Sequence, residues 1–250
     1  MKLTENYRSI VKFIPAIFLI LLLFISCTIL EARTGIKTGP DTRLIYVLQK
    51  AGFKELKNSE FKIAIVDPDD SKLTEDDLKI LHSQDKILLA YLSIGEAEDY
   101  RDYWEESWET GNPDFIDDEN PNWDGNYKVR YWYKSWQEIL FSSLDKIINL
   151  NYDGVYLDII DAYQYYEEKG FDSAEKNMSD LVINISRQSK TINKNFLGIP
   201  QNSEELLISK DYLGAIDGIG RENLWYIGNT PQDEKELKTA LLYLKGAVYS

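Results

Sequence analysis

The sequence predicts an α/β fold built as a (β/α)8 TIM barrel, and three observations support this prediction. First, apolar runs rich in β-forming residues alternate with helical patterns, as in parallel sheets that are covered on both faces. Second, several of these runs end in acidic or amide residues, and the carboxyl ends of barrel strands are where this architecture places catalysis. Third, 250 residues are enough for one barrel or for two smaller domains. The strand count and the positions of the polar residues favour a barrel over a doubly wound sheet.

The predicted elements follow one another in a regular order. Seven runs indicate strands, at residues 43–48, 62–66, 87–93, 154–157, 196–199, 215–219 and 246–249. Helical patterns lie between most of them, at residues 74–83, 135–149, 173–193 and 232–245. The first of these helices opens with Thr74 as a predicted N-cap and with an acidic first turn. A closed barrel needs eight strands, so the sequence predicts an incomplete barrel of about seven strands, short at its C-terminal end.

The N-terminal segment is expected to lie outside the barrel, which we place at residues 41–250. Lys2, Arg8 and Lys12 accompany an apolar run at residues 13–25 that is shorter than a membrane span and typical of a signal peptide. Residues 24–27, Phe-Ile-Ser-Cys, resemble the bacterial lipobox, although phenylalanine stands where leucine is usual. We therefore expect a lipoprotein signal peptide at residues 1–26, a lipid on Cys27 and a flexible tether at residues 27–40. An uncleaved anchor helix is the alternative, and both place the remaining chain outside the cytoplasmic membrane.

Charge and composition exclude several classes of function. The chain carries a formal net charge of −14, and the first 26 residues hold three basic residues and one acidic residue, so the remainder is at −16. Such a surface repels nucleic acid and attracts cationic substrates at low salt. His82 and Cys27 are the only histidine and the only cysteine. We therefore expect no metal site, no cofactor, no Ser-His-Asp triad and no disulfide within the chain.

Asp158 is the most informative residue of the sequence. It directly follows the predicted strand at residues 154–157 and lies in an apolar run, where an unpaired carboxylate costs several kcal/mol to bury. A second acid, Asp161, follows three residues later. Two interpretations remain open at this point: a carboxylate whose charge is used in catalysis, and an aspartate that caps the next helix.

The other predicted strands also end in polar residues, and a barrel would bring these ends to one face. They are Gln49, Asp67, Glu96, Glu98, Gln201, Asn202, Arg221 and Glu222. This set of residues suits a reaction that is catalysed by carboxyl groups alone, and glycoside hydrolysis is the leading example. In this reaction one acid must be protonated while another is ionised. Acids that lie close together in a partly desolvated site shift one another's pKa values apart, which produces these two states. The alternative is helix capping and surface ion pairing, which we favour for Asp67, Asp69, Asp70 and Glu98, whereas we favour catalysis for Asp158 and Glu222.

Aromatic residues are concentrated in the long segment after the third predicted strand. Five of the six tryptophans lie there, at positions 104, 108, 123, 132 and 136, and the sixth is Trp225. Aromatic faces bind the apolar faces of sugar rings and also bind cations. The alternative is a small core that holds the segment against the barrel, and we expect at least two rings to reach the substrate.

Several of these motifs together resemble the endo-α-1,4-polygalactosaminidase-like proteins, glycoside hydrolase family 114. The motifs are Tyr-Val-Leu-Gln at 46–49, Ser-Ile-Gly-Glu-Ala-Glu-Asp-Tyr-Arg at 93–101, residues 123–132, Gly-Val-Tyr-Leu-Asp at 154–158, Pro-Gln-Asn at 200–202 and Gly-Ile-Gly-Arg-Glu at 218–222. The resemblance implies a (β/α)8 barrel, secretion and hydrolysis of α-1,4-linked galactosamine polymers. It also implies a retaining mechanism, with Asp158 as nucleophile and Glu222 as general acid/base.

The expected partners are a polysaccharide or oligosaccharide substrate, possibly cationic, and a membrane reached through the lipid on Cys27. The residues that we expect to contact the substrate are Tyr46, Gln49, Asp67, Glu96, Arg101, Trp123, Asp161, Gln201, Asn202, Arg221 and Trp225. A non-catalytic carbohydrate-binding surface lipoprotein on a degenerate barrel is the alternative function. A purely structural envelope protein would explain the anchor but not the acids at successive strand ends.

Overall fold

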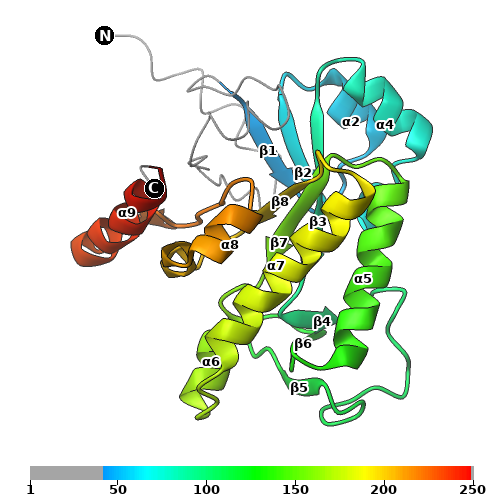
Figure 1. Ribbon diagram of the computed structural model, residues 1–250. Helices are drawn as coiled ribbons and strands as arrows, with labels where there is room; N and C mark the ends of the chain where they lie inside the picture. Colours follow the sequence, from blue (N-terminus) through cyan, green and yellow to red (C-terminus); the bar gives the residue numbers. More distant parts are fainter. Residues whose placement is uncertain (1–41, 249–250) are drawn as a thin grey trace.

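A five-stranded parallel sheet forms the centre of the molecule (Figure 1). The computed structural model describes residues 42–248. The strands are β1 (Leu44–Val47), β2 (Ile63–Val66), β3 (Ile87–Ser93), β7 (Gly154–Asp158) and β8 (Leu197–Pro200), and they lie side by side in this order. Their order in space follows their order along the chain, as in a barrel, whereas a doubly wound sheet reverses its order at a switch point. The predicted α/β class and the first five predicted strands are therefore confirmed, although the described sheet does not close.

Helices cover one face of this sheet. The helices between residues 42 and 248 are α2 (Phe53–Asn58), α3 (Pro68–Ser71), α4 (Glu75–His82), α5 (Lys134–Asn149), α6 (Ala162–Glu168), α7 (Ala174–Ile192), α8 (Lys210–Ala215) and α9 (Glu234–Val248), with a 3-10 helix, η2 (Glu204–Ile208). Helix α9 lies to the side of the sheet and packs against η2. Helices α5 and α7 run along the sheet in Figure 1. The four predicted helices correspond to α4, α5, α7 and α9. Thr74 and Asp77 form a reciprocal capping box at the start of α4, as the N-cap prediction requires.

The two faces of the sheet are both apolar. Side chains of a strand alternate between its faces, so each strand contributes to two separate clusters. One cluster, which includes Val66, Leu88 and Leu157, packs against the helices. The other, on the opposite face, consists of Ile63, Ile65, Ile87, Leu89, Tyr91, Tyr156, Leu197 and Ile199, each less than a tenth exposed. Burial on both faces explains why the strands are continuous apolar runs in the sequence.

The sixth predicted strand, at residues 215–219, does not form a regular strand. Helix α8 ends at Ala215, and the chain then runs parallel to β8 with a single bridge between Gln201 and Gly220. Three backbone hydrogen bonds hold it there: Asp217 N to Gly198 O (2.9 Å), Gly220 N to Pro200 O (2.9 Å) and Asn202 N to Gly220 O (2.7 Å). We call residues 216–222 the bridged segment.

The seventh predicted strand, at residues 246–249, is wrong, because residues 246–248 form the last turn of α9. Ala240, Leu244 and Ala247 continue a helical spacing and are buried. This face of α9 packs against η2, where Leu206 and Leu207 are buried. The helical pattern predicted for residues 232–245 therefore continues into residues 246–248, where the sequence predicts a strand.

The segment between β3 and α5 contains an unpredicted antiparallel sheet. Its strands are β4 (Glu96–Glu98), β5 (Ile116–Glu119) and β6 (Asn126–Val129), in the order β4-β6-β5. Most aromatic rings of this segment pack on one another, as Trp108 does against Tyr103, Trp104 and Phe115. Trp136 is fully buried, whereas Trp123 is 61% exposed. The small-core interpretation therefore describes most of these rings.

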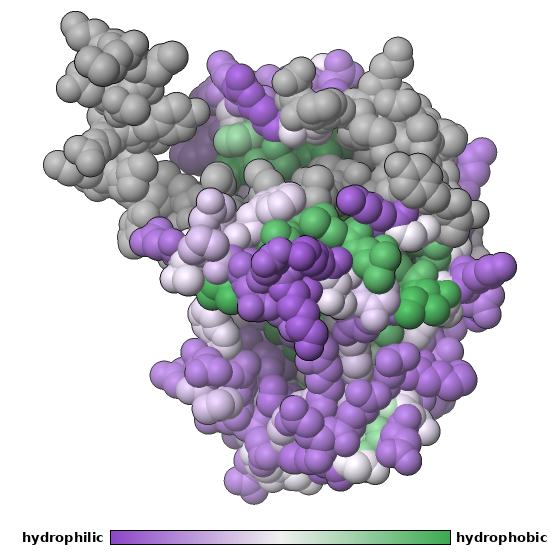
Figure 2. Space-filling model, turned by 90° about the vertical axis from the view of Figure 1, so that its left-hand side faces the viewer, coloured by the Kyte–Doolittle hydropathy of each residue, from purple (hydrophilic) through white to green (hydrophobic). Residues whose placement is uncertain are grey.

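Figure 2 views the molecule from the side of α8 and α9, where apolar residues lie among hydrophilic ones. A short hairpin precedes α9 and consists of β9 (Tyr226–Ile227) and β10 (Thr230–Pro231). The large apolar side chains that are exposed on η2, the hairpin and α9 are Ile208, Tyr226, Ile227 and Leu242.

The predicted signal peptide, the lipid-carrying Cys27 and the tether lie outside the described residues. Between residues 42 and 248, no helix has the length and apolar character that crossing a membrane would require.

Gly154, at the start of β7, allows a close approach between two central strands. A Cβ atom at this position would lie 2.3 Å from the carbonyl oxygen of Leu197 and 2.5 Å from its Cβ. We expect Gly154→Ala to lower the free energy of unfolding by about 1–3 kcal/mol, because a central strand must move to admit the methyl group. The melting temperature should fall by roughly 3–10 °C in thermal unfolding followed by circular dichroism.

Gly246→Ala is the matched control, because Gly246 is an exposed helical position with open space around its missing Cβ. This change should stabilise α9 by about 1 kcal/mol. A Gly154→Ala protein that melts at the wild-type temperature would contradict the close packing of β7 against β8.

Candidate active site

Asp158 is the last residue of β7, and two donors hold its carboxylate. The Tyr91 hydroxyl donates to Oδ2 at 2.8 Å, and the backbone N–H of Ile159 donates to Oδ1 at 2.8 Å. Burial raises the pKa of Asp158 to about 7, against the lowering effect of both hydrogen bonds. Glu222 and Asp161 raise this pKa further by charge repulsion. The carboxyl group can therefore gain or lose its proton near neutral pH.

Three tyrosines surround this carboxylate on the face of the sheet that lacks the helices. Tyr91 pairs with Tyr156 across β3 and β7, and the Tyr46 ring meets the Tyr156 ring edge-on at 5.6 Å between centroids. Burial and the charge of Asp158 raise the pKa of each hydroxyl well above its usual value. The tyrosines therefore stay neutral and can donate hydrogen bonds. Tyr46 is one of the predicted substrate contacts, whereas Tyr91 and Tyr156 are not. The alternation of Tyr156 with Asp158 along β7, and the pairing of Tyr91 with Tyr156, is the signal that could have identified them.

Glu222 lies at the end of the bridged segment, where Asn202 and Arg221 hold it. Its backbone N–H donates to Asn202 Oδ1 at 2.9 Å, and Arg221 Nη1 donates to its carbonyl oxygen at 2.7 Å. Arg221 also pairs with the buried Glu204 at 3.0 Å. Desolvation and Asp161 raise the pKa of Glu222, while Arg221 and a hydrogen bond with Asn202 lower it. Asn202 and Arg221, which were expected to contact substrate, thus support a predicted catalytic acid.

Asp161 and Glu222 lie close enough to Asp158 to raise its pKa, and Asp161 also raises the pKa of Glu222. Desolvation is the main cause of the raised pKa of Asp161, and Glu96 and Glu205 add to it. Asp161 occupies the position before α6 but makes no side-chain capping bond, and Asp158 lies three residues earlier. The helix-capping interpretation of these acids therefore does not describe the structure. Three carboxyl groups with raised pKa values can divide the roles of proton donor and ionised nucleophile among them.

Asp67, Arg101 and Glu98 form an ion-pair network at the ends of β2 and β4. Arg101 donates to Asp67 Oδ1 at 2.8 Å, to Asp69 Oδ2 at 2.9 Å and to Glu98 Oε2 at 2.5 Å. Asp67 also caps α3 by accepting from the backbone N–H of Asp69. The Tyr100 hydroxyl donates to Glu98 Oε1 at 2.7 Å. This is the capping and ion pairing that we favoured for Asp67, Asp69 and Glu98, and it occupies Arg101, which was expected to contact substrate.

The remaining predicted contacts differ widely in exposure. Glu96 is 1% exposed and accepts from Asn120 and Lys128. Gln201 is buried at the end of β8, and its Oε1 has no hydrogen-bond partner among the described residues. The solvent-exposed members are Gln49, Trp123 and Trp225.

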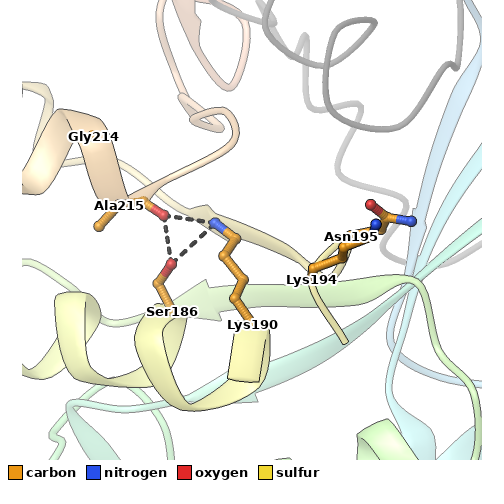
Figure 3. Close-up of a pocket in the computed structure, with 6 residues that line it drawn as sticks. All are labelled: Ser186, Lys190, Lys194, Asn195, Gly214 and Ala215. Atoms are coloured by element: carbon orange, nitrogen blue, oxygen red, sulfur yellow. Dashed lines mark hydrogen bonds between the residues drawn. The ribbon is translucent and has the colours of Figure 1, made fainter. Parts of the chain in front are cut away.

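A separate pocket lies at the amino edge of the sheet, away from these carboxylates (Figure 3). Asn195, which precedes β8, lines it together with Ser186, Lys190, Lys194, Gly214 and Ala215. Lys190 donates to Asp217 Oδ2 at 2.7 Å and to the Ala215 carbonyl oxygen at 2.9 Å, so it ties α7 to the start of the bridged segment. Within residues 42–248, no group of three or more histidine, cysteine, aspartate or glutamate side chains is arranged to hold a metal ion.

Comparisons with known proteins identify the family and the fold. A model of glycoside-hydrolase family GH114 matches residues 30–224. An uncharacterised protein of Thermotoga maritima is 36% identical over an alignment that covers 94% of this chain and 76% of that protein. The glycoside hydrolase domain of PelA from Pseudomonas aeruginosa superposes with a TM-score of 0.64 at 16% identity, covering 83% of this chain and 79% of that chain. The Aspergillus fumigatus Ega3 complex with galactosamine superposes with a TM-score of 0.54 at 16% identity, covering 71% of this chain and 63% of that chain.

At 16% identity, the two solved structures show that the fold is that of TIM-barrel glycoside hydrolases. The family match is the stronger finding for membership, because it runs from before β1 to Leu224 and includes Asp158, Asp161 and Glu222. It also includes all five strands of the parallel sheet. The chain therefore belongs to glycoside hydrolase family 114.

Proposed function

We propose that this protein hydrolyses an α-linked amino-sugar polysaccharide by a retaining mechanism with two carboxyl groups. The observation that carries the proposal is the Asp158 carboxyl group, which is desolvated, held by two donors and electrostatically coupled to Glu222. No cofactor is needed, because carboxyl groups alone supply both the nucleophile and the proton.

Asp158 acts as the nucleophile in this mechanism. Burial raises its pKa to about 7, and its two hydrogen-bond donors oppose this effect, so the ionised carboxylate is present at neutral pH. This carboxylate attacks the anomeric carbon and forms a covalent glycosyl-enzyme. Glu222 acts as the general acid/base. Desolvation and the repulsion from Asp161 favour its protonated form, which gives a proton to the leaving glycosidic oxygen. Glu222 then removes a proton from the water that hydrolyses the intermediate.

The charge around the site supports a cationic substrate. Carboxylates outnumber cations at this edge of the sheet; the acids are Asp67, Glu96, Glu98, Asp158, Asp161, Glu204, Glu205 and Glu222, and the cations are Arg101, Lys128 and Arg221. Such an excess of negative charge attracts a polymer with free amino groups. The Ega3 structure, which shares the fold, was determined in complex with galactosamine, and this supports an amino sugar as the substrate here. We further propose that the lipid on Cys27 anchors the protein outside the cytoplasm, where such polymers are found.

Removing either proposed acid should abolish hydrolysis. We expect Asp158→Asn and Glu222→Gln each to lower the release of reducing ends from α-1,4-galactosaminan by at least about 10³-fold, because each step needs both groups. The melting temperature should change little. Asp172→Asn is the matched control, since Asp172 is exposed in the loop before α7, and it should keep wild-type activity. Hydrolysis retained by either site variant would remove that residue from its role, and polymer binding without hydrolysis by the wild type would favour the carbohydrate-binding alternative.

Removing the Tyr91 hydroxyl should shift the pH dependence of the reaction. The hydrogen bond from Tyr91 lowers the pKa of Asp158, so Tyr91→Phe should raise this pKa above its value of about 7. The limb of the kcat/KM profile that belongs to Asp158 should then move to higher pH. Tyr212→Phe is the control, because the hydroxyl of Tyr212 is buried without a hydrogen-bond partner among the described residues. Identical profiles for Tyr91→Phe and the wild type would show that this hydrogen bond does not influence the reacting carboxylate.

The degree of N-acetylation should control turnover if the charge of the substrate matters. We expect galactosaminan to be cleaved faster than its fully N-acetylated form, with the ratio falling as ionic strength rises, because salt screens the attraction. The measurement is initial rate against sodium chloride concentration for both polymers. Equal rates on both polymers at low salt would contradict a substrate that is recognised by its charge.

A further inference from the structure

Ile159, the residue after the proposed nucleophile, has a backbone conformation that its side chain disfavours. Its φ angle is +59°, in the left-handed region, where a β-branched residue is a rare outlier. Such outliers persist only where the surrounding structure enforces them, and they cluster at functional sites. The left-handed turn also directs the chain from β7 into α6, whose first residue, Ala162, donates its N–H to the Ile159 carbonyl oxygen at 3.4 Å.

Gly95 provides the space that this turn needs. A Cβ atom at position 95 would lie 2.2 Å from the Ile159 carbonyl oxygen, 2.9 Å from its Cγ2 and 2.6 Å from the Cβ of Ala162. The nearest of these atoms is backbone, so it cannot move aside by a change of rotamer. Any side chain at position 95 would displace the turn.

The backbone around Gly95 is itself held on both sides. The N–H of Ile94 donates to the Asp158 carbonyl oxygen at 3.1 Å, and the buried Trp136 donates its indole N–H to the Ile94 carbonyl oxygen at 3.0 Å. The Gly95 carbonyl oxygen accepts from the N–H of Val129 in β6 at 3.3 Å. The β3–β4 connection is therefore a firm surface against which the Ile159 turn packs.

The consequence of this packing is a fixed carboxylate. In the left-handed turn the N–H of Ile159 donates to Asp158 Oδ1, while Tyr91 donates to Oδ2, so one oxygen has a donor from the residue after β7 and the other has a donor from β3. With both oxygens held, the carboxylate plane cannot rotate freely about its χ2 bond.

We propose that Gly95 and the left-handed backbone of Ile159 position the Asp158 carboxylate for attack, and that Gly95 is a positioning residue of this enzyme. This inference rests on the proposed role of Asp158 as nucleophile. It adds two residues that act through Asp158 to the machinery of the reaction. A nucleophile that is held in its reactive orientation avoids the rate loss of roughly 10²-fold that accompanies small misplacements.

The titration of Asp158 is a readout of this geometry. Tyr46, Tyr91, Tyr156, Asp161 and Glu222 are the titratable groups that interact with Asp158 from the neighbouring elements. The three atoms nearest to a Cβ at position 95 belong to Ile159 and Ala162 and to none of these groups. A side chain at position 95 therefore meets the Ile159 turn first.

The first experiment uses NMR on the wild-type protein with 13C-labelled aspartate carboxyl groups and 15N-labelled backbone amides. The Asp158 carboxyl signal is assigned by its loss in Asp158→Asn. Since the Ile159 amide donates to this carboxylate, its proton shift should follow the same titration curve, near pH 7. An Ile159 amide that does not move through the Asp158 titration would overturn the proposal without any variant at position 95.

The second experiment compares Gly95→Ala with Gly154→Ala, a matched change in which the new methyl group meets the backbone at the other end of β7. Gly95→Ala should raise the pKa of Asp158 above about 7, because the N–H donor moves away. It should lower kcat by roughly tenfold to a hundredfold at pH 6 with little change in KM. Gly154→Ala should lower the melting temperature but keep the wild-type pKa of Asp158.

A wild-type pKa of Asp158 in folded Gly95→Ala would overturn the positioning role, as would an equal shift in both glycine variants. Absence of hydrolysis by wild-type protein, with the expected NMR titrations, would instead reject the proposed function and leave the geometric link between Gly95 and Asp158 intact.

Discussion

The carboxylate of Asp158 lies where burial disfavours its charge, and the hydrogen-bond donors beside it stabilise the charged form. Desolvation raises its pKa, whereas the donors from Tyr91 and Ile159 lower it, so the balance lies near neutral pH. An apolar residue at this position would leave both donors without an acceptor, and an unpaired buried donor is costly. The tyrosines, the left-handed turn and the close approach of Gly95 are therefore parts of one arrangement that depends on a single acid.

The second acid, Glu222, is held by a different set of interactions. Glu222 follows a segment that lacks a regular strand ladder, and side chains supply much of its support. Lys190 and Asp217 connect the start of this segment to α7, and Asn202 and Arg221 hold its end. Asp217 is 4% exposed and its carboxylate also accepts from the backbone N–H of Gly198. Sheet geometry therefore sets the position of Asp158, whereas side-chain hydrogen bonds and ion pairs set the position of Glu222.

The five central strands and four of the helices could be predicted from the sequence, because their periodicity is strong and local. The prediction failed at residues 246–249, where β-forming residues follow a helical pattern and only packing against η2 decides the outcome. It also missed the β4-β6-β5 sheet, whose short strands carry acids and amides rather than apolar alternation. Within the site, the sequence could locate Asp158, Asp161 and Glu222 by their places after strand-like runs. It could not reveal the ion pairs of Arg101 with Asp67 and of Arg221 with Glu204, because ion pairing depends on distances between segments far apart in the chain.

The bridged segment also determines how independently the two acids can move. Asp158 belongs to a strand that is paired on both sides, so displacing it requires the sheet to open. The bridged segment, which ends in Glu222, is held by a single bridge and three backbone hydrogen bonds. Elements with few ladder bonds open locally at lower free energy than central strands. In hydrogen exchange, the amides of residues 216–222 thus belong to a less protected unit than those of β7. The proposed acid/base is therefore freer to change its distance to the proposed nucleophile, which stays fixed in the sheet.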